Sequence, residues 1–425
     1  MAASIAVSEK VVARPYSPGN ETVEPTRVLI FDLLPTVPYY TGYLSAALKR
    51  MENVEVVLAA ATYTHDRTCF ERMRLQNAPG ICDFAYRSRT TSIRRVLKLM
   101  EYLLNMALFA AHFGKRKPDV IHVQFTPLME RNLPFELWFL KAARARGIKL
   151  VYTVHNILPH EGSEQLRSSY CELYRIIDQL ICHDAITKQR MISEFRVDPD
   201  RVSVIPHGPL FTEATFTGAT CNYERARAMT GLPLDARVVL WQGIIRPYKG
   251  ISLLLRAWQA ARQEGLDAVL AIVGTGEKSA LRELQQQVRS LGIASSVHLD
   301  LRFVSVEELG AYHEAADILV YPYSAITSSG ALATGIGYGK AIIASALPAF
   351  HQMLEHEKDA LLVPHDDVRA WANALVRLTS DDDLRTRLAR QLAAGCAAGP
   401  DWDGIASETL SVYRRPLFPA FHLSA

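Results

Sequence analysis

Two basic side chains follow a predicted strand closely enough to bind one anion. The segment 243–250, GIIRPYKG, comes directly after the apolar run 237–242 and before a helical segment. Arg246 offers a planar fork of donors and Lys249 a point charge, which together suit a diphosphate. A solvated basic loop is the alternative, but the flanking glycines and the strand exit favour a phosphate site.

A helix start later in the chain is a second candidate for binding the same anion. The segment 327–334, TSSGALAT, follows the apolar run 317–323. Small hydroxyl residues and a glycine at a helix start leave backbone N–H groups open, and the helix dipole favours negative charge there. A simple serine N-cap is the alternative. The segment 273–279, VGTGEKS, lacks the third glycine of a dinucleotide fingerprint and instead indicates a turn where a ligand can approach the backbone.

Polar side chains also follow a strand in the first half of the chain. His155 and Asn156 end the apolar run 149–156, and His160 and Glu161 come just beyond. A histidine at a strand end is often structural. Several polar groups at one strand exit favour a role in binding a substrate.

The elements that must position these residues form a pattern that occurs twice. Short apolar runs alternate with helical segments in the first half, the stretch 209–234 is rich in Thr, Gly and Pro, and the alternation restarts at Arg237. Continuous apolar strands between helices predict parallel sheets covered on both faces. Ligands of such sheets bind at the carboxyl ends of the strands, so we expect two α/β units that face a common cleft.

Composition excludes several classes of protein. The 425 residues include 47 Lys and Arg and 44 Asp and Glu, a net charge of +3 that does not indicate a nucleic-acid protein. The six cysteines show no CxxC spacing, so neither a zinc site nor a disulfide framework is predicted. Residues 1–26 lack the apolar core of a secretory signal, and we expect a flexible tail on a cytoplasmic protein.

The motifs taken together resemble the group 1, family 4-like glycosyltransferases of GT-B fold, which have two Rossmann-like, doubly wound parallel-sheet domains. The resemblance runs from about Arg27 to Arg415, and among its anchors are VYTVHNILPHE, VSVIPHG, WQGIIRPYKG, AIVGTGE and SSGALATGIGYGKAIIAS. It implies a tail (1–26), an acceptor domain (27–208), a hinge region (209–234), a nucleotide-sugar donor domain (235–398) and a C-terminal helix crossing back to the first domain (399–425).

The same resemblance implies an activity and a set of site residues. The family transfers a sugar from a nucleotide-diphosphate donor with retention of configuration and without a catalytic metal or cofactor. The implied catalytic residues are His155 near the sugar and the diphosphate pair Arg246 and Lys249. The implied donor-binding residues are Gly42, Gly243, Gly274, Arg302, Phe303, Ser329, Gly330, Ala331, Leu332 and Thr334, and the acceptor-side residues are Asn156, His160 and Glu161.

This chain departs from the family pattern at two donor-side positions. Many members carry two glutamates eight residues apart, and this chain has Ile326 and Thr334 there. Thr334 offers the ribose a single uncharged hydrogen bond. The first nucleotide-facing loop, 38–42, has one glycine where the family often has two.

A lipophilic segment with basic flanks points to the acceptor. Residues 92–117 contain the run VLKLMEYLLNMALFAAHF, with basic residues before and after it. Such a helix can lie on an anionic membrane surface, and a helix packed into the core is the alternative. We therefore expect a lipid-linked or polysaccharide acceptor and an enzyme on the inner membrane face. A sugar-nucleotide epimerase and a noncatalytic scaffold that binds sugar nucleotide remain as alternatives.

Overall fold

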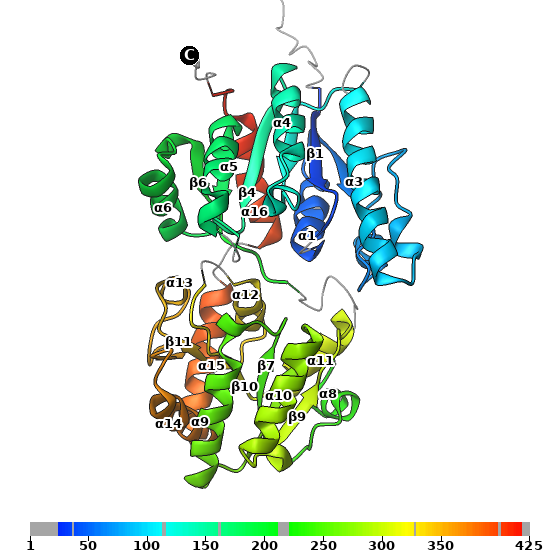
Figure 1. The fold of residues 1–425 in the computed structure, drawn as a ribbon. Coiled ribbons are helices and arrows are strands. Elements are labelled where there is room, and N and C mark those ends of the chain that lie inside the picture. Colours follow the sequence, from blue (N-terminus) through cyan, green and yellow to red (C-terminus); the bar gives the residue numbers. More distant parts are fainter. Residues whose placement is uncertain are drawn as a thin grey trace, which may run out of the picture.

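The computed structural model describes residues 24–35, 38–112, 116–159, 163–210, 221–326, 329–397 and 401–418, which form two α/β units (Figure 1). Each unit has a six-stranded sheet, with strand orders β2-β1-β3-β4-β5-β6 and β12-β11-β10-β7-β8-β9. The strand pairs in both sheets are parallel. The predicted GT-B architecture of two doubly wound sheets is confirmed.

The first unit comprises the first six strands and the helices around them. Its strands are β1 (Thr26–Asp32), β2 (Val54–Ala60), β3 (Val120–Val123), β4 (Lys149–Val154), β5 (Gln179–Cys182) and β6 (Val202–Val204). Its helices are α1 (Pro38–Leu48), α2 (Cys69–Arg72), α3 (Thr91–His112), α4 (Phe135–Ala145), α5 (Ser163–Ile176) and α6 (Ala185–Phe195), with short 3-10 turns η1 (Ala85–Arg87), η2 (Met129–Arg131) and η3 (Pro199–Arg201).

The second unit repeats the arrangement. Its strands are β7 (Arg237–Gln242), β8 (Ala268–Val273), β9 (Val297–Asp300), β10 (Ile318–Tyr321), β11 (Ala341–Ser345) and β12 (Leu361–Val363). Its helices are α8 (Tyr223–Thr230), α9 (Ile251–Gln263), α10 (Lys278–Ser290), α11 (Val306–Ala315), α12 (Gly330–Gly337), α13 (Pro348–His351), α14 (Val368–Ser380) and α15 (Asp382–Ala397), with turns η4 (Pro247–Lys249) and η5 (Ala294–Ser296). The last helix of the chain is α16 (Trp402–Arg414).

The strands are apolar along their length because both faces of each sheet are covered. In β1, Leu29 and Phe31 enter one core cluster while Val28 and Ile30 enter another. Successive side chains of a strand point to opposite faces, so a strand with two buried faces needs an unbroken apolar run. The continuous runs in the sequence follow from this requirement.

The final helix, α16, lies in the first unit although it follows the second unit in the chain (Figure 1). Trp402 stacks on Tyr43 of α1, with ring centroids 5.2 Å apart. Near the other end of α16, the ammonium of Lys149 donates to the carbonyls of Val412 and Tyr413 in the last helical turn, where carbonyls lack the usual partner four residues on. Lys149 therefore ties this end of α16 to β4.

The predicted loop 38–42 is wrong, because α1 begins at Pro38. Proline is favoured at the first position of a helix, where its missing N–H costs nothing. Gly42 lies inside α1 and is buried, and a β-carbon placed there would lie 2.3 Å from the Met73 sulfur. Gly42 thus permits packing of α1 on the segment after α2 and does not face a nucleotide.

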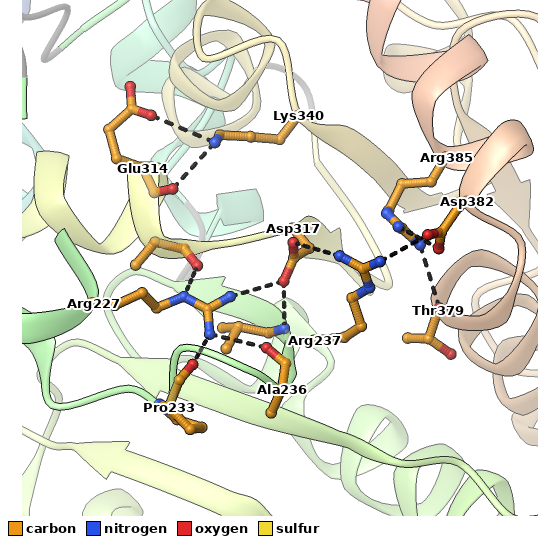
Figure 2. Close-up of polar contacts among 12 residues, drawn as sticks. Arg227, Pro233, Ala236, Arg237, Glu314, Asp317, Lys340, Thr379, Asp382 and Arg385 are labelled. Atoms are coloured by element: carbon orange, nitrogen blue, oxygen red, sulfur yellow. Dashed lines mark hydrogen bonds and ion pairs between the residues drawn. The ribbon is translucent and has the colours of Figure 1, made fainter. Parts of the chain in front are cut away.

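The second unit reaches back into the predicted hinge region 209–234. Within it, α8 packs on α11 through Arg227, whose fully buried guanidinium donates to Asp317 at 2.9 Å and to the Ala315 carbonyl at 2.6 Å (Figure 2). Arg227 also donates to the carbonyls of Pro233 and Ala236. Residues 221–234 are therefore part of the second unit, and residues 211–220 lie outside the described part of the chain. Among the described helices, none is both long and apolar enough to cross a membrane.

Candidate functional site

The carboxyl ends of the two sheets line a common cavity of about 370 Å³. The first unit contributes Tyr63, Phe125, His155 and His207, and the second unit contributes the segments after β7, β8 and β10. A larger cavity of about 620 Å³ lies between α3 and the amino-terminal ends of β1 and β2, with walls that include Leu29 and Phe109. The smaller cavity is the candidate site because it occupies the strand edge where doubly wound folds bind ligands.

Lys249 forms the cationic part of the cavity wall. It ends the turn η4 after β7, and its Nζ donates to the Tyr323 hydroxyl at 3.2 Å. A β-carbon on Gly243 (φ +142°) would lie 2.7 Å from that Nζ, and one on Gly274 (φ +146°) would lie 1.9 Å from the Gly243 carbonyl oxygen. The two predicted glycines thus let the β7 and β8 exits approach each other and leave room for the ammonium.

Arg246 does not join Lys249 at this wall. It is exposed, and it lines a separate small cavity of about 140 Å³ beside α9 and α10. The backbone at Arg246 is extended and the chain then turns through Pro247–Lys249, so the two side chains leave the turn in different directions. Ile244 lies on the wall of the candidate site. In this structure Arg246 and Lys249 therefore line different cavities, and a shared role at a diphosphate stays a prediction.

The start of α12 forms the facing part of the wall. Ser329, Gly330 and Ala331 line the cavity, and Ser329 caps the helix because its Oγ accepts from the Leu332 amide at 3.1 Å. The amides of Gly330 and Ala331 belong to the first helical turn, where no intrahelical acceptor exists. The Leu332 amide is thus engaged by the cap, and two of the three predicted amides are left for a ligand.

Thr334 does not reach the cavity. Its side chain is fully buried in α12, and its hydroxyl donates to the Gly330 carbonyl at 2.7 Å. The predicted ribose contact is therefore wrong for this structure, because a mid-helix threonine bonds most easily to the carbonyl one turn back. Thr327 and Ser328, which belong to the same motif, lie outside the described residues.

The loop after β9 connects the cavity to the first unit. Arg302 lines the cavity and pairs with Asp300 at 2.9 Å and with Glu308 at 2.5 Å, so its charge is compensated. Phe303 stacks on His65 of the first unit, with ring centroids 4.7 Å apart. A second link between the units is the ion pair of Arg72 with Glu307.

His155 directly follows β4, lines the cavity and is partly buried among other rings. Phe125 stacks on its ring at 4.6 Å, and Tyr40 meets the ring edge-on at 4.8 Å. Its Nδ1 lies 3.3 Å from His183 Nε2, and its Nε2 lies 3.1 Å from Gln124 Oε1. Burial holds the pKa of His155 well below its usual range, so the imidazole is neutral. Asn156 also lines the cavity, and His160 and Glu161 lie outside the described residues.

His207 of the first unit lies against the start of α12 in the second unit. Its Nδ1 lies 2.6 Å from the Gly208 carbonyl oxygen, and a β-carbon on Gly330 would lie 3.2 Å from its Nε2. Burial lowers the pKa of His207 to about 3. The first unit thus contributes two neutral histidines, His155 and His207, to the cavity wall.

Among the aromatic residues of the wall that the sequence prediction missed are Tyr63, Phe125, His207 and Tyr323. Each of them follows a strand by a few residues, as His155 and Lys249 do. The strand-exit rule that found the predicted residues would have found these too if it had been applied to every strand.

The chemistry of the cavity favours an anionic ligand with an aromatic or sugar part. Its described wall has the Lys249 ammonium and two helix-start amides, and it has no carboxylate. In the described ranges, no three His, Cys, Asp or Glu side chains are grouped to hold a metal ion. Aromatic rings and a neutral imidazole supply flat surfaces and hydrogen-bonding groups for an uncharged portion.

Two family models match this chain. The family described as "Glycosyltransferase Family 4" matches residues 37–208, and the one described as "Glycosyl transferases group 1" matches residues 236–381. One matched range falls within each of the two α/β units.

Individual proteins give the same picture. The chain is 31% identical over 293 residues to D-inositol 3-phosphate glycosyltransferase of Nocardioides sp. and 28% identical over 280 residues to that of Corynebacterium efficiens. These alignments cover 63% of this chain, and 62% and 65% of the relatives, so the chain spans less than two thirds of their length. Anabaena HepE, solved in complex with UDP and glucose, shares the fold with a TM-score of 0.68 at 17% identity, over 91% of this chain and all of that one.

Proposed function

Because this chain belongs to the group 1 glycosyltransferases of GT-B fold, we propose that it transfers a sugar from a nucleotide-diphosphate sugar to an acceptor. The observation that carries the proposal is the placement of Lys249 and the start of α12 on one cavity between the two units. An ammonium and helix-start amides that face each other suit the diphosphate of such a donor.

The same groups suggest how the donor's bond to the sugar is broken. Charge develops on the leaving diphosphate, and Lys249 with the amides of Gly330 and Ala331 would stabilise it. This positive wall would serve the purpose that a metal ion serves in other transferases. We therefore propose a metal-independent reaction.

We propose retention of configuration by attack on the same face of the sugar. In that route the leaving phosphate takes the acceptor's proton, and no enzyme carboxylate acts as nucleophile. The described wall offers no carboxylate near His155, which supports this route. His155 would contact the transferred sugar, and contacts such as Phe303 with His65 would keep water from the closed cavity.

The test is a panel of nucleotide sugars with the purified chain. A true donor at about 100 times its dissociation constant adds roughly 2.7 kcal/mol to the stability of the folded state, which appears as a raised melting temperature. We expect one donor to do this and to give a glycosylated product only when an acceptor is added. A new sugar nucleotide formed without acceptor would indicate an epimerase, and binding with neither transfer nor donor hydrolysis would indicate a scaffold. If no nucleotide sugar raises the melting temperature, the proposal is wrong.

We further propose that the acceptor is lipid-linked or a growing polysaccharide and that the protein works at the inner face of the membrane. The element that contacts the membrane would be α3, which covers most of the lipophilic segment 92–117 singled out in the sequence. The exposed fractions of Ile93, Val96, Met100 and Leu104 are 55%, 60%, 59% and 45%. Their spacing of three, four and four residues puts them on one face of the helix.

The charges on α3 favour an anionic surface as the partner. Arg94, Arg95 and Lys98 lie among the exposed apolar residues, whereas Glu101, the one acidic residue of the helix, is buried. Its carboxylate accepts from the amides of Phe84 and Ala85 at 2.6 and 2.7 Å. Apolar side chains with cations around them bind anionic lipid by burial and by attraction together.

We confine the proposed contact to the amino-terminal half of α3. Met106 is buried in the first core, and Leu108 and Phe109 line the larger cavity. Lys115 lies outside the described residues, and Arg116 and Lys117 follow the other end of a 22-residue helix, about 33 Å from its start. The alternative of a core helix therefore applies only to the face that carries Tyr102 and Met106.

Vesicle flotation tests the membrane contact separately from the chemistry. We expect the wild type to float with anionic vesicles, less at high salt, and not with neutral ones. The double variant Val96→Ser/Met100→Ser should lose flotation. The matched control Met229→Ser/Leu234→Ser removes exposed apolar side chains from the second unit and should float like the wild type. Equal flotation of both variants would refute the α3 contact and leave the transferase proposal standing.

A further inference from the structure

Three histidines meet around one tyrosine beside the candidate site. His155, His183 and His207 follow β4, β5 and β6, which are neighbours in the sheet. Their ring centroids lie 4.8, 5.3 and 5.0 Å from that of Tyr40, which is buried. Of these three histidines, the sequence predicts a role for His155 alone. His183 is a buried imidazole to which no role has been assigned.

The hydrogen bonds of His183 determine where its proton lies. Its Nδ1 is 3.0 Å from the carbonyl oxygen of Ile205. A carbonyl only accepts, so Nδ1 carries the proton and donates it. In the neutral ring Nε2 then has a lone pair, and this atom is 3.3 Å from Nδ1 of His155.

The same reasoning fixes the proton on His155. Burial lowers the pKa of His183 to about 4 and holds that of His155 well below its usual range, so each ring has one proton. The lone pair on His183 requires a donor, and Nδ1 of His155 must supply it. Nε2 of His155 is then an acceptor.

Gln124 agrees with this assignment once its amide is turned. Its Oε1 faces Nε2 of His155 at 3.1 Å, and its buried amide nitrogen has no partner among the described residues. The two ends of an amide are interchangeable in shape, so a half-turn places the N–H₂ group against the lone pair. The turned amide donates to Nε2 of His155, and its oxygen takes the buried place where no partner lies among the described residues.

We propose that His183 is a positioning residue that holds His155 in the tautomer with its proton on Nδ1. In the chain from the Ile205 carbonyl through His183 to His155, Nε2 of His155 then accepts from the Gln124 amide, so the ring is held at both nitrogens where it lines the cavity. This inference rests on the proposed function for the role of His155 beside the transferred sugar. Without His183, the proton moves to Nε2, where it donates to Oε1 of Gln124, and Nδ1 loses the partner that fixes the ring.

The test uses ¹⁵N NMR of the histidine rings, which reports the tautomer without any turnover. In the wild type we expect protonated Nδ1 and bare Nε2 at His155. The variant His183→Phe should reverse this pattern, and His183→Gln should keep it because the glutamine oxygen can accept from Nδ1. The control His313→Gln changes a buried histidine of the second unit and should leave the His155 signals unchanged.

Kinetics provide the second readout. With a donor identified, His183→Phe should lower kcat at least about tenfold with little change in KM, and His183→Gln should restore most of it. An unaltered His155 tautomer in His183→Phe would overturn the inference. If that variant does not fold, a wild-type His155 with its proton on Nε2 overturns it equally. A reversed tautomer in a protein that transfers no sugar would instead count against the proposed function.

Discussion

The ammonium nitrogen of Lys249 lies 3.2 Å from the hydroxyl oxygen of Tyr323 and 5.0 Å from the centre of its ring. Tyr323 is buried and follows β10, the strand that pairs with β7 beside the Lys249 turn. In the described part of the chain no carboxylate pairs with Lys249, so a neutral side chain holds its ammonium in place. The positive charge remains uncompensated for an anionic ligand in the cavity.

Replacing Lys249 by methionine should reduce kcat/KM about a hundredfold or more, because one charge that faces the leaving diphosphate is lost in a closed site. Steady-state kinetics with the identified donor measure this. Arg246→Met is the matched control, and we expect only a small loss because Arg246 lines a different cavity. Similar losses in the two variants would show that Arg246 acts on the diphosphate together with Lys249.

Chelation should leave the transfer rate unchanged. The proposal assigns the stabilisation of the leaving group to Lys249 and to the amides of Gly330 and Ala331. Rates measured after dialysis against EDTA, at constant ionic strength, should equal those before. A requirement for added magnesium or manganese that sodium cannot replace would contradict the proposal.

The free energy of unfolding should fall in acid because His122 is buried in its neutral form. Burial lowers the pKa of His122 to about 3, with its nitrogens 2.7 Å from the hydroxyls of Tyr413 and Thr153. Between about pH 3 and 6.5 the unfolded chain binds a proton there that the folded chain does not. The stabilisation is therefore complete above pH 6.5 and is lost as the pH falls through this window.

Urea unfolding of wild type and His122→Gln over this pH range measures the effect. The free energy of unfolding should depend less on pH in the variant than in the wild type. The slopes of the two proteins should differ by up to about 1.4 kcal/mol per pH unit. Parallel curves for the two proteins would mean that folding does not shift the pKa of His122.

Loss of Arg227 should destabilise the second unit. Its buried guanidinium pairs with Asp317, which also accepts from the Val238 amide at 2.8 Å (Figure 2). Arg227→Ala leaves that carboxylate without its main cation and should cost about 3–5 kcal/mol in the free energy of unfolding. Arg225→Ala, an exposed change on the same helix, should cost less than about 0.5 kcal/mol. Denaturant unfolding that shows equal effects would refute the role of this network.

The fold was largely predictable because its signals are local. An apolar run such as 237–242 is needed wherever both faces of a strand are buried, and the repetition of such runs gave the two parallel sheets. The strand-exit rule also located His155, Lys249 and the start of α12. These positions depend only on where a strand ends, which the sequence pattern records.

Other features could not be predicted because they depend on contacts between distant segments. Gly42 looked like part of a loop, but its role is set by Met73, which packs against α1. Arg246 and Lys249 are three residues apart, yet the η4 turn sends them to different cavities. Spacing along the chain does not specify the direction of side chains through an irregular turn.

The sequence by itself determined two α/β units, the order of their strands along the chain and the sheet edge that lines the candidate cavity, because periodicity and strand length are local properties. Only the tertiary structure decided that His183 meets His155, and that α3 exposes Ile93 and Val96 while it buries Met106. Each of these depends on which distant surface covers a given face, and that is settled by packing among all the elements at once.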